Sequence, residues 1–288
     1  MDRLAQFDEL RPLMFSLAYR MLSSRADAED VLQECFLRWQ SADIDEIRSP
    51  KSYLTTVVAR LSLDSLKAAH RQREKYVGPW LPEPLIDRPV TDSIEMAESL
   101  SMAFLHVLET LSPVERVAFL LREVFDVSYA EVAAILETTE ANSRQLVTRA
   151  RKHVRDKRPR FAVDRERHAA VLRRFLKACA SGDLSELVAQ LKDDVIVYTD
   201  GGGKGAVPNP IYGIDKVTRL LLGLARKAPP GLSGGYLADV NGEPGFVFTL
   251  DGKINSVLTL DVDEDARIRT VFLVVNPDKL PRGSISVS

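Results

Sequence analysis

The 288-residue sequence has few of the residues that build disulfide, metal or redox sites. It holds two cysteines, Cys35 and Cys179, both within helical patterns, and four dispersed histidines. A disulfide framework or a zinc site needs several such residues at short, regular spacings. We therefore expect neither a metal nor a cofactor.

Long hydrophobic runs are also missing. The opening residues, MDRLAQFDEL, are acidic and lack the apolar segment of a signal peptide. No apolar stretch approaches the roughly 20 residues that a membrane-spanning helix requires. We expect a soluble, cytoplasmic protein with no membrane association.

Net charge of either sign is small, because 39 Lys and Arg meet 41 Asp and Glu. The distribution is nevertheless uneven. Residues 139–160 hold eight basic and two acidic residues, and residues 48–75 hold seven and two, whereas residues 161–288 are balanced. Two local basic clusters predict two separate contacts with a polyanion.

One of these clusters overlaps the stretch 128–154, SYAEVAAILETTEANSRQLVTRARKHV. Ser128-x-x-Glu131 is a capping box that predicts a helix start, and Thr138 and Thr139 interrupt the pattern before a second helix. Amide and guanidinium groups read base edges, and basic groups hold phosphates. The stretch therefore predicts a helix-turn-helix, with the solvated face of an ordinary helical hairpin as the alternative. The candidate DNA contacts on the second helix are Asn142, Ser143, Arg144, Gln145, Thr148, Arg149, Arg151 and Lys152.

The N-terminal part reads as three amphipathic helices, two within residues 3–40 and one from Pro50 to about Lys75. The run AYRMLSSRADAEDVLQECFLRW, followed by SPKSYLTTVVARLSLDSLKAAHRQRE, resembles region 2 of the extracytoplasmic-function (ECF) sigma factors. Residues 112–154 resemble region 4 of the same family.

This resemblance implies that the chain binds core RNA polymerase and promoter DNA. The second helix would dock on the clamp helices of the β′ subunit through its outward residues Asp30, Gln33, Glu34 and Arg38, and region 4 would meet the β flap. The loop 41–50 and the third helix would engage the promoter −10 element, with Lys51, Arg60, Asp64, Lys67, Arg71 and Arg73 as candidates. The helix-turn-helix would read the −35 element. Where the family often has Val-Lys-Ser-Arg, residues 143–146 read Ser-Arg-Gln-Leu, so the −35 sequence itself is not predicted.

The remainder divides into a Pro-rich linker, residues 76–94, a helix over 94–110, a further helix opening at Ser112-Pro113, and a C-terminal part from 161. There two helices precede strand-like runs at 195–199, 235–240, 245–250, 253–262 and 267–275, with a helix over 214–226. Asp251-Gly252 predicts a hairpin turn. Helices followed by an antiparallel sheet predict an α+β domain. The expected domains are 1–75, the linker 76–94, 95–160 and 161–288.

The C-terminal order resembles the SnoaL-like branch of the NTF2-like cone fold, as found in the SigJ-like subgroup of ECF sigma factors. Three motifs carry this resemblance: Trp80, Leu81, Pro82, Glu83 and Pro84; Asp200, Gly201, Gly202, Gly203 and Lys204; and Asn276, Pro277, Asp278, Lys279 and Leu280. The resemblance implies a fused regulator that acts in cis and uses these residues between domains.

Three functions compete for this sequence. The first and favoured is a promoter-specificity subunit of RNA polymerase without enzymatic activity. The second is a one-component regulator with a ligand-sensing pocket, which has no need of a polymerase-docking helix. The third is a SnoaL-like enzyme with Asp194, Tyr198 and Asp200 in a pocket, although residues 200–204 read more simply as a strand-ending turn and lack P-loop spacing. A small-molecule ligand of the C-terminal domain stays open.

Overall fold

The computed structural model describes residues 3–43, 47–73, 76, 78–86, 100–157, 164–203, 207–228 and 234–281, with only the backbone for residues 69–73. The chain forms two compact units. One, here the helical unit, comprises residues 1–75 and 107–159. The other, the sheet unit, comprises residues 76–106 and 160–288. The boundary falls inside one helix, α5 (Met102–Leu108), between His106 and Val107.

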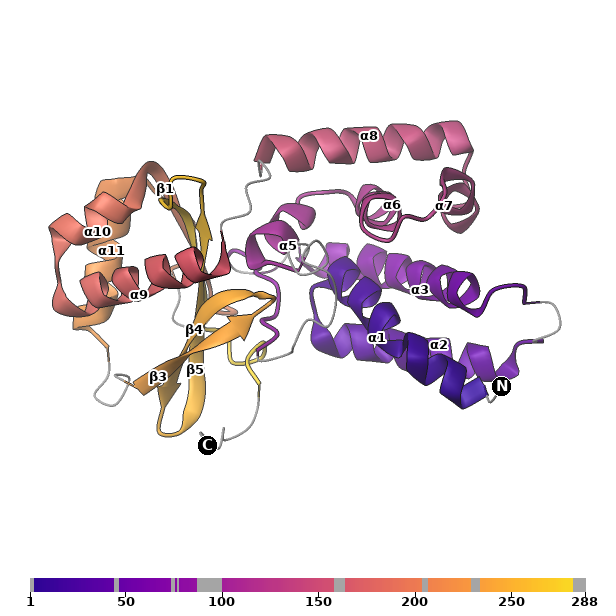
Figure 1. The fold of residues 1–288 in the computed structure, drawn as a ribbon, viewed down its shortest axis with the longest axis horizontal. Helices are drawn as coiled ribbons and strands as arrows, with labels where there is room; N and C mark the ends of the chain where they lie inside the picture. The colour runs from indigo at the N-terminus through magenta and orange to yellow at the C-terminus, as the bar shows by residue number, and fades with distance from the viewer. Residues whose placement is uncertain are drawn as a thin grey trace. The chain divides into compact units, whose positions relative to one another are not determined.

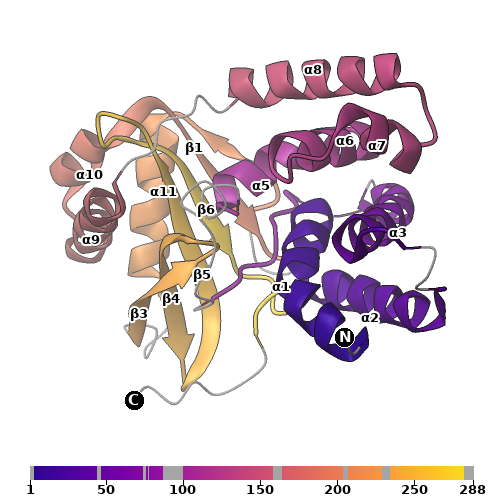
Figure 2. The ribbon, with the colours of Figure 1, turned by 45° about the vertical axis from the view of Figure 1, so that its right-hand side comes forward.

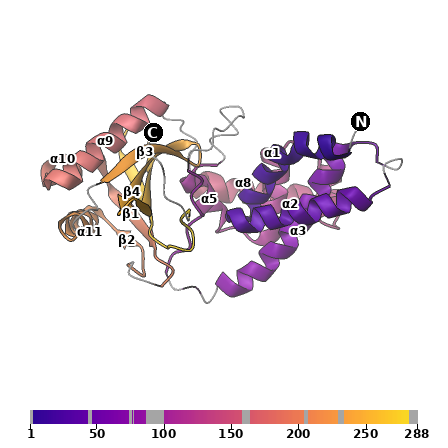
Figure 3. The same ribbon diagram turned by 90° about the horizontal axis from the view of Figure 1, so that it is seen from below.

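Three helices form the first half of the helical unit: α1 (Arg3–Leu22), α2 (Arg25–Ser41) and α3 (Pro50–Arg73), which all pack on one another (Figure 3). The Ser24 hydroxyl caps α2 by accepting the Asp27 backbone N–H at 3.2 Å. Trp39 is fully buried, and its indole N–H donates to the Arg3 carbonyl at 2.9 Å. This hydrogen bond satisfies the polar atom of the largest side chain in the α1–α2 core.

The second half contains α6 (Pro113–Glu123), α7 (Tyr129–Ile135) and α8 (Glu140–Lys157). Figure 1 shows α6 and α7 between α8 and the three N-terminal helices, in agreement with the packing of α6 and α7 on both α8 and α3. Arg116 of α6 is 2% exposed. Its guanidinium donates to the Arg20 carbonyl at 2.8 Å and to the Ser23 hydroxyl at 2.6 Å, and pairs with Glu109 at 2.8 Å. A buried charge thus joins α6 to the end of α1.

The sheet unit is built on six strands in the order β2-β1-β6-β5-β4-β3. They are β1 (Leu191–Asp200), β2 (Ile211–Tyr212), β3 (Gly234–Val240), β4 (Glu243–Leu250), β5 (Lys253–Val262) and β6 (Ile268–Val274). Strands β1 and β6 pair in parallel, and every other pair is antiparallel. Besides the start of α5, the described residues of this unit form the helices α9 (Arg165–Ser181), α10 (Leu184–Gln190) and α11 (Ile214–Arg226).

The two faces of this sheet are covered by different parts of the chain. Alternating residues such as Leu258 and Leu260 pack against α9, α10 and α11, which lie together on one side in Figure 2. The other face, with Val257, packs against Leu81, Met102 and Leu280, residues that come from the linker, α5 and the tail. Leu81 of the linker and Leu280 of the tail are therefore part of this unit's core.

The structure confirms the expected fold class of helical segments followed by an α+β domain, although the sheet is not wholly antiparallel as predicted, because β1 and β6 pair in parallel. The helix over 214–226 is observed as predicted. The turn at Asp251-Gly252 is also observed, and both of its residues have positive φ. Residues 94–99 of the expected helix over 94–110 lie outside the described residues. Within the described part of the chain, no helix is long and apolar enough to cross a membrane, and no group of His, Cys, Asp and Glu has the arrangement of a metal site.

Candidate nucleic-acid interface

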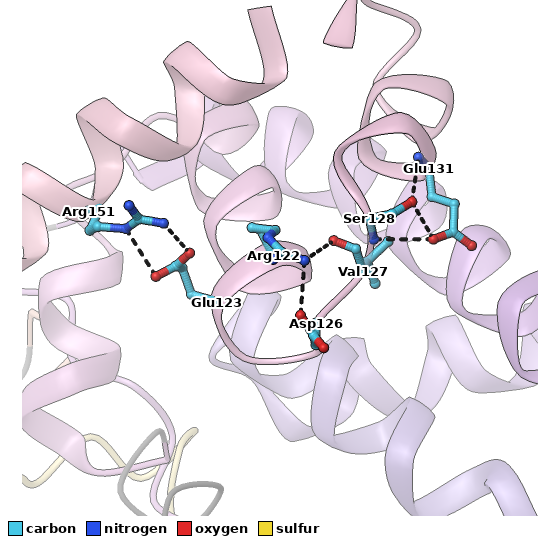
Figure 4. Close-up of polar contacts among 7 residues, drawn as sticks. All are labelled: Arg122, Glu123, Asp126, Val127, Ser128, Glu131 and Arg151. Atoms are coloured by element: carbon cyan, nitrogen blue, oxygen red, sulfur yellow. Dashed lines mark hydrogen bonds and ion pairs between the residues drawn. The ribbon is translucent and has the colours of Figure 1, made fainter. Parts of the chain in front are cut away.

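The helix-turn-helix is assembled by local hydrogen bonds (Figure 4). The Ser128 hydroxyl accepts the Glu131 backbone N–H at 3.2 Å, and the Glu131 carboxylate accepts the Ser128 N–H at 3.2 Å, which completes the predicted capping box of α7. After α7 the turn passes through Glu137 at φ 52°, and the Thr139 hydroxyl accepts the Asn142 N–H at 3.2 Å. Both helix starts therefore use the residues that the sequence indicated.

The outward face of α8 is polar and basic. Its exposed residues are Asn142, Arg144, Gln145, Thr148, Arg149, Arg151 and Lys152, and Leu146, Val147 and Ala150 are buried beneath them. Four of the exposed residues line an open hollow of about 310 Å³: Arg144, Gln145, Thr148 and Arg149. The exposed face around it carries amide, hydroxyl and guanidinium groups, which are the side-chain donors suited to base edges.

Ser143 does not belong to this face. It is fully buried with Leu146, Val147 and Ala150, because it follows the same side of the helix at three- and four-residue spacing. Its selection as a DNA contact was therefore wrong. Asn142 is exposed, but its side-chain amide donates to the Thr138 hydroxyl at 2.8 Å, so part of its hydrogen-bonding capacity stabilises the turn.

Three arginines of α8 pair with carboxylates of the same chain. Arg144 pairs with Glu140, Arg149 with Glu115 at 3.3 Å, and Arg151 with Glu123 at 2.6 Å (Figure 4 for the last). The Glu123 carboxylate, through its hydrogen bond and charge, raises the pKa of Arg151 above its ordinary value. All three pairs lie at the surface, where water and salt weaken them.

The candidate −10 residues on α3 differ in their surroundings. Lys51, Asp64 and Lys67 are exposed. The side chains of Arg71 and Arg73 lie outside the described residues, as do loop residues 44–46. Arg60 instead donates to the Ala134 carbonyl at 2.9 Å, at the end of α7. Nearby, the Ser52 hydroxyl donates to Glu131 at 3.0 Å. The α3 helix is thereby joined to the helix-turn-helix.

The candidate polymerase-docking face of α2 is exposed as expected, with Asp30, Gln33, Glu34 and Arg38 at the surface and an Arg38–Glu34 pair at 2.9 Å. The structure adds Leu37, which is 59% exposed among these polar residues. The sequence already indicated that Leu37 is exposed, because it falls outside the apolar band of Val31, Leu32, Cys35, Phe36 and Trp39. A single exposed leucine is common on protein surfaces, so Leu37 marks a position to test and does not by itself define an interface.

The three C-terminal motifs meet within the sheet unit at Asp200, which is fully buried. Its carboxylate accepts hydrogen bonds from the Tyr76 hydroxyl, from the Leu81 N–H at 2.9 Å and from Lys279 at 2.7 Å. Lys279 also donates to the Leu81 carbonyl at 2.5 Å and lies 3.2 Å from the centroid of the Trp80 ring. We call this group, residues 76, 80, 81, 200 and 279, the latch.

Two neighbours complete the latch. The Asn276 side-chain amide donates to the Tyr76 hydroxyl at 3.0 Å, and burial together with the Asp200 hydrogen bond raises the pKa of Tyr76. Gly202 has φ 61°, and a Cβ there would lie 2.8 Å from the Asn276 side chain, so glycine is required.

Leu280 is buried in the sheet core, whereas Lys204, the last residue of its motif, lies outside the described residues. Sequence reasoning missed Tyr76, which no motif includes.

The residues suggested for a catalytic pocket do not converge. Asp194 is exposed, and the Asp200 carboxylate is occupied by the latch. Tyr198 lies on the sheet face that α5 covers, with its ring 4.4 Å from that of His106. Met102 and Ala103 are buried on the same face. This chain's own residues thus occupy the side of the sheet opposite the helices.

Two family models match the helical segments of the chain. The Sigma-70 region 2 family matches residues 6–72, and the Sigma-70 region 4 family matches residues 101–154. The chain is 41% identical to the ECF RNA polymerase sigma factor SigJ of Mycobacterium tuberculosis, over 96% of this chain and 92% of that protein. It is 30% identical to the probable ECF RNA polymerase sigma factor SigI of the same species, over 94% and 92%. The crystal structure of M. tuberculosis SigJ superimposes with a TM-score of 0.78, at 39% identity over 96% of this chain and 97% of that one.

Proposed function

Because the chain belongs to the ECF sigma factors, which bind core RNA polymerase and direct transcription initiation at promoters, we propose a role for each exposed face described above. The outward face of α8 reads the −35 element, α3 engages the −10 element, and α2 docks on the β′ clamp helices. The helix-turn-helix region also meets the β flap. The sheet unit modulates these activities in cis, and the chain works in the cytoplasm, where bacterial polymerase is found.

The observation that carries the −35 assignment is the hollow on α8. Arg144 and Thr148 are four residues apart, as are Gln145 and Arg149, so the four side chains share one face over less than two turns. A bidentate contact from Arg to guanine or from Gln to adenine gives about 1–3 kcal/mol of discrimination against the wrong base. The flanking Arg151 and Lys152 supply phosphate contacts, which add affinity without sequence preference.

One candidate −10 residue already has partners within the chain. Arg60 donates to the Ala134 carbonyl at 2.9 Å and to the Ile135 carbonyl at 3.5 Å, both at the end of α7. These two bonds use part of the five N–H donors of the guanidinium, so a DNA phosphate would bind through the remaining ones. Lys51 and Lys67 are also exposed on the same helix.

Polymerase docking is tested at Leu37. We expect the substitution Leu37→Asp to abolish capture of the full-length chain by core polymerase, because it places a charge in the centre of an interface. The matched control is Leu184→Asp, since Leu184 is similarly exposed, at 52%, but lies on the sheet unit. Equal capture of both variants would remove α2 from the interface.

Modulation by the sheet unit is supported by the latch. Trp80 and Leu81 of the linker, together with Met102 of α5, belong to the sheet unit although they precede or begin the region 4 match. The linker is therefore not a free spacer between the two DNA-binding segments. A change in the latch alters how freely α5 and the segments beside it move.

The test uses full-length variants, because removing residues 161–288 would expose Leu81 and Met102. Tyr76→Phe removes one hydroxyl from Asp200 and Asn276, and Lys279→Met removes the buried charge. We expect both to change run-off transcription by purified core polymerase at least severalfold, relative to Glu186→Gln on the exposed surface of the same unit. Circular dichroism confirms that each variant is folded. Unchanged transcription by both folded latch variants would contradict modulation by the sheet unit, but it would not contradict the activity of the chain as a sigma factor.

A further inference from the structure

We propose that Tyr129 is a positioning residue for promoter reading, because its ring holds the guanidinium of Arg144 in place on the recognition helix. This inference rests on the proposed −35 role of α8. The guanidinium carbon of Arg144 lies over the Tyr129 ring, 4.3 Å from its centroid. That of Arg122 lies over the same ring at 5.0 Å. Both distances are within the range of cation–π attraction.

Arg144 needs such support because its side chain is long and exposed. Bidentate reading of a base requires the planar guanidinium fork to lie in the plane of that base. An arginine that samples many rotamers loses conformational entropy on binding and discriminates less. A ring that already holds the guanidinium removes part of this loss before DNA arrives.

The two contacts of Arg144 differ in what they leave available. Glu140 accepts from one terminal nitrogen on the edge of the guanidinium, and the edge carries the N–H groups that a base or phosphate would use. Tyr129 covers the face of the guanidinium and uses none of these N–H groups. DNA therefore competes with Glu140 for the edge, whereas the Tyr129 contact is compatible with bound DNA.

Tyr129 is well placed for this role because its backbone is held at the start of α7. It follows Ser128, whose capping box closes on Glu131 (Figure 4). Arg122 approaches the ring while its guanidinium binds Asp126 at 2.9 Å and the Val127 carbonyl at 3.1 Å. The segment between α6 and α7 is thus fixed on both sides of the tyrosine, and the ring provides a rigid platform for α8.

The first test measures base preference. Full-length wild type, Arg144→Ala, Tyr129→Phe, Tyr129→Leu and the double variant Tyr129→Leu/Arg144→Ala are each combined with core polymerase. Bound duplexes are then selected from a promoter-length pool randomised over both elements and sequenced. We expect Arg144→Ala to flatten the preference at one upstream base position. Tyr129→Leu reduces that same preference about two- to fivefold, as expected for a surface cation–π contact, and Tyr129→Phe retains it.

The double variant separates positioning from general damage to the fold. Because Tyr129 acts through Arg144, Tyr129→Leu should have no further effect on base preference when Arg144 is absent. Equal loss of preference at all positions, an unchanged preference, or a further loss in the double variant would each overturn the positioning role. If Arg144→Ala leaves every preference intact, base reading by Arg144 fails and the positioning role fails with it.

The second test is independent of DNA. Stacking on a tyrosine ring displaces the NMR signals of the Arg144 δ and ε protons upfield. We expect this displacement in the wild type and in Tyr129→Phe, and its loss in Tyr129→Leu. Ordinary Arg144 shifts in the wild type would contradict the contact itself, whatever the outcome of the selection.

Discussion

The ion pairs of α8 and the ion pair of the latch involve the same chemical groups in opposite surroundings. In the Arg151–Glu123 pair the side chains are 51% and 17% exposed, whereas in the Lys279–Asp200 pair they are 8% and 0% exposed. Exposed pairs contribute about 0–1 kcal/mol and exchange readily for other partners. Removing one partner of a buried pair costs about 3–5 kcal/mol, because the other charge is left unpaired. Exposed ion pairs suit a surface that binds and releases DNA, whereas a buried ion pair suits a contact that stays formed in the folded protein.

The largest expected effect comes from Asp200→Asn. It leaves Lys279 buried without its counter-charge, so we expect the sheet unit to lose about 3–5 kcal/mol of unfolding free energy. The chain has two tryptophans, Trp39 in the helical unit and Trp80 in the latch. In a Trp39→Phe background, Trp80 fluorescence during urea unfolding therefore reports on the latch alone. Glu186→Gln is the control. If Asp200→Asn lowers the unfolding free energy no more than the control does, the latch does not stabilise the sheet unit.

A comparable effect is expected in the helical unit at Arg116. Arg116→Met removes a buried charge from Glu109, the Arg20 carbonyl and Ser23, and we expect a loss of about 3 kcal/mol. Trp39 fluorescence in a Trp80→Phe background measures it. Arg122→Met, which breaks an exposed pair on the same helix, should cost less than about 1 kcal/mol. Equal losses in the two variants would contradict the distinction between buried and exposed pairs.

A smaller effect is expected when the exposed pairs of α8 are released. Glu123→Gln frees Arg151 and removes a negative charge near the DNA-binding face, so we expect affinity for a random duplex to rise about two- to fivefold at low salt. Fluorescence anisotropy measures this rise, which should shrink as salt is added. Glu186→Gln makes the same charge change on the sheet unit and should leave affinity unchanged. A rise that is independent of salt would argue against an electrostatic origin.

The smallest effect concerns pH at the contact between α3 and α7. Hydrogen bonds from Ser128 and then Ser52 lower the pKa of Glu131 below its ordinary value of 4.5. Because the folded-state pKa is the lower one, this stabilisation is fully present above pH 4.5 and is lost as pH falls through the folded-state pKa. Ser52→Ala should therefore lower the urea midpoint slightly at pH 7. A difference from wild type that persists undiminished at pH 3 would show that the Glu131 charge is not involved.

Local features of this fold were readable from the sequence because they depend on neighbours a few residues apart. The capping box at Ser128 and Glu131 and the turn at Asp251-Gly252 are of this kind. So is the polar face of α8, apart from Ser143, which a stricter count of helical spacing would have assigned to the buried side.

Contacts between distant segments could not be predicted from the sequence. The spacing of apolar residues shows which side of a helix is buried, but not which other segment packs against it. Arg116 looks like an ordinary surface arginine in the sequence, yet it binds the end of α1, 96 residues away. Tyr76 and Asp200 are 124 residues apart. The motifs around Trp80, Asp200 and Lys279 could be recognised individually, but only the fold shows that they form one cluster.

Helix α5 has a consequence for how such a chain can be recombined. Its seven residues begin in the core of the sheet unit and end in the helical unit. A chimaera that exchanges only residues 161–288 would therefore replace the sheet but keep a linker and a helix shaped for the old one. The exchangeable module is discontinuous, residues 76–106 together with residues 160–288, and a functional graft must carry both segments from the same parent.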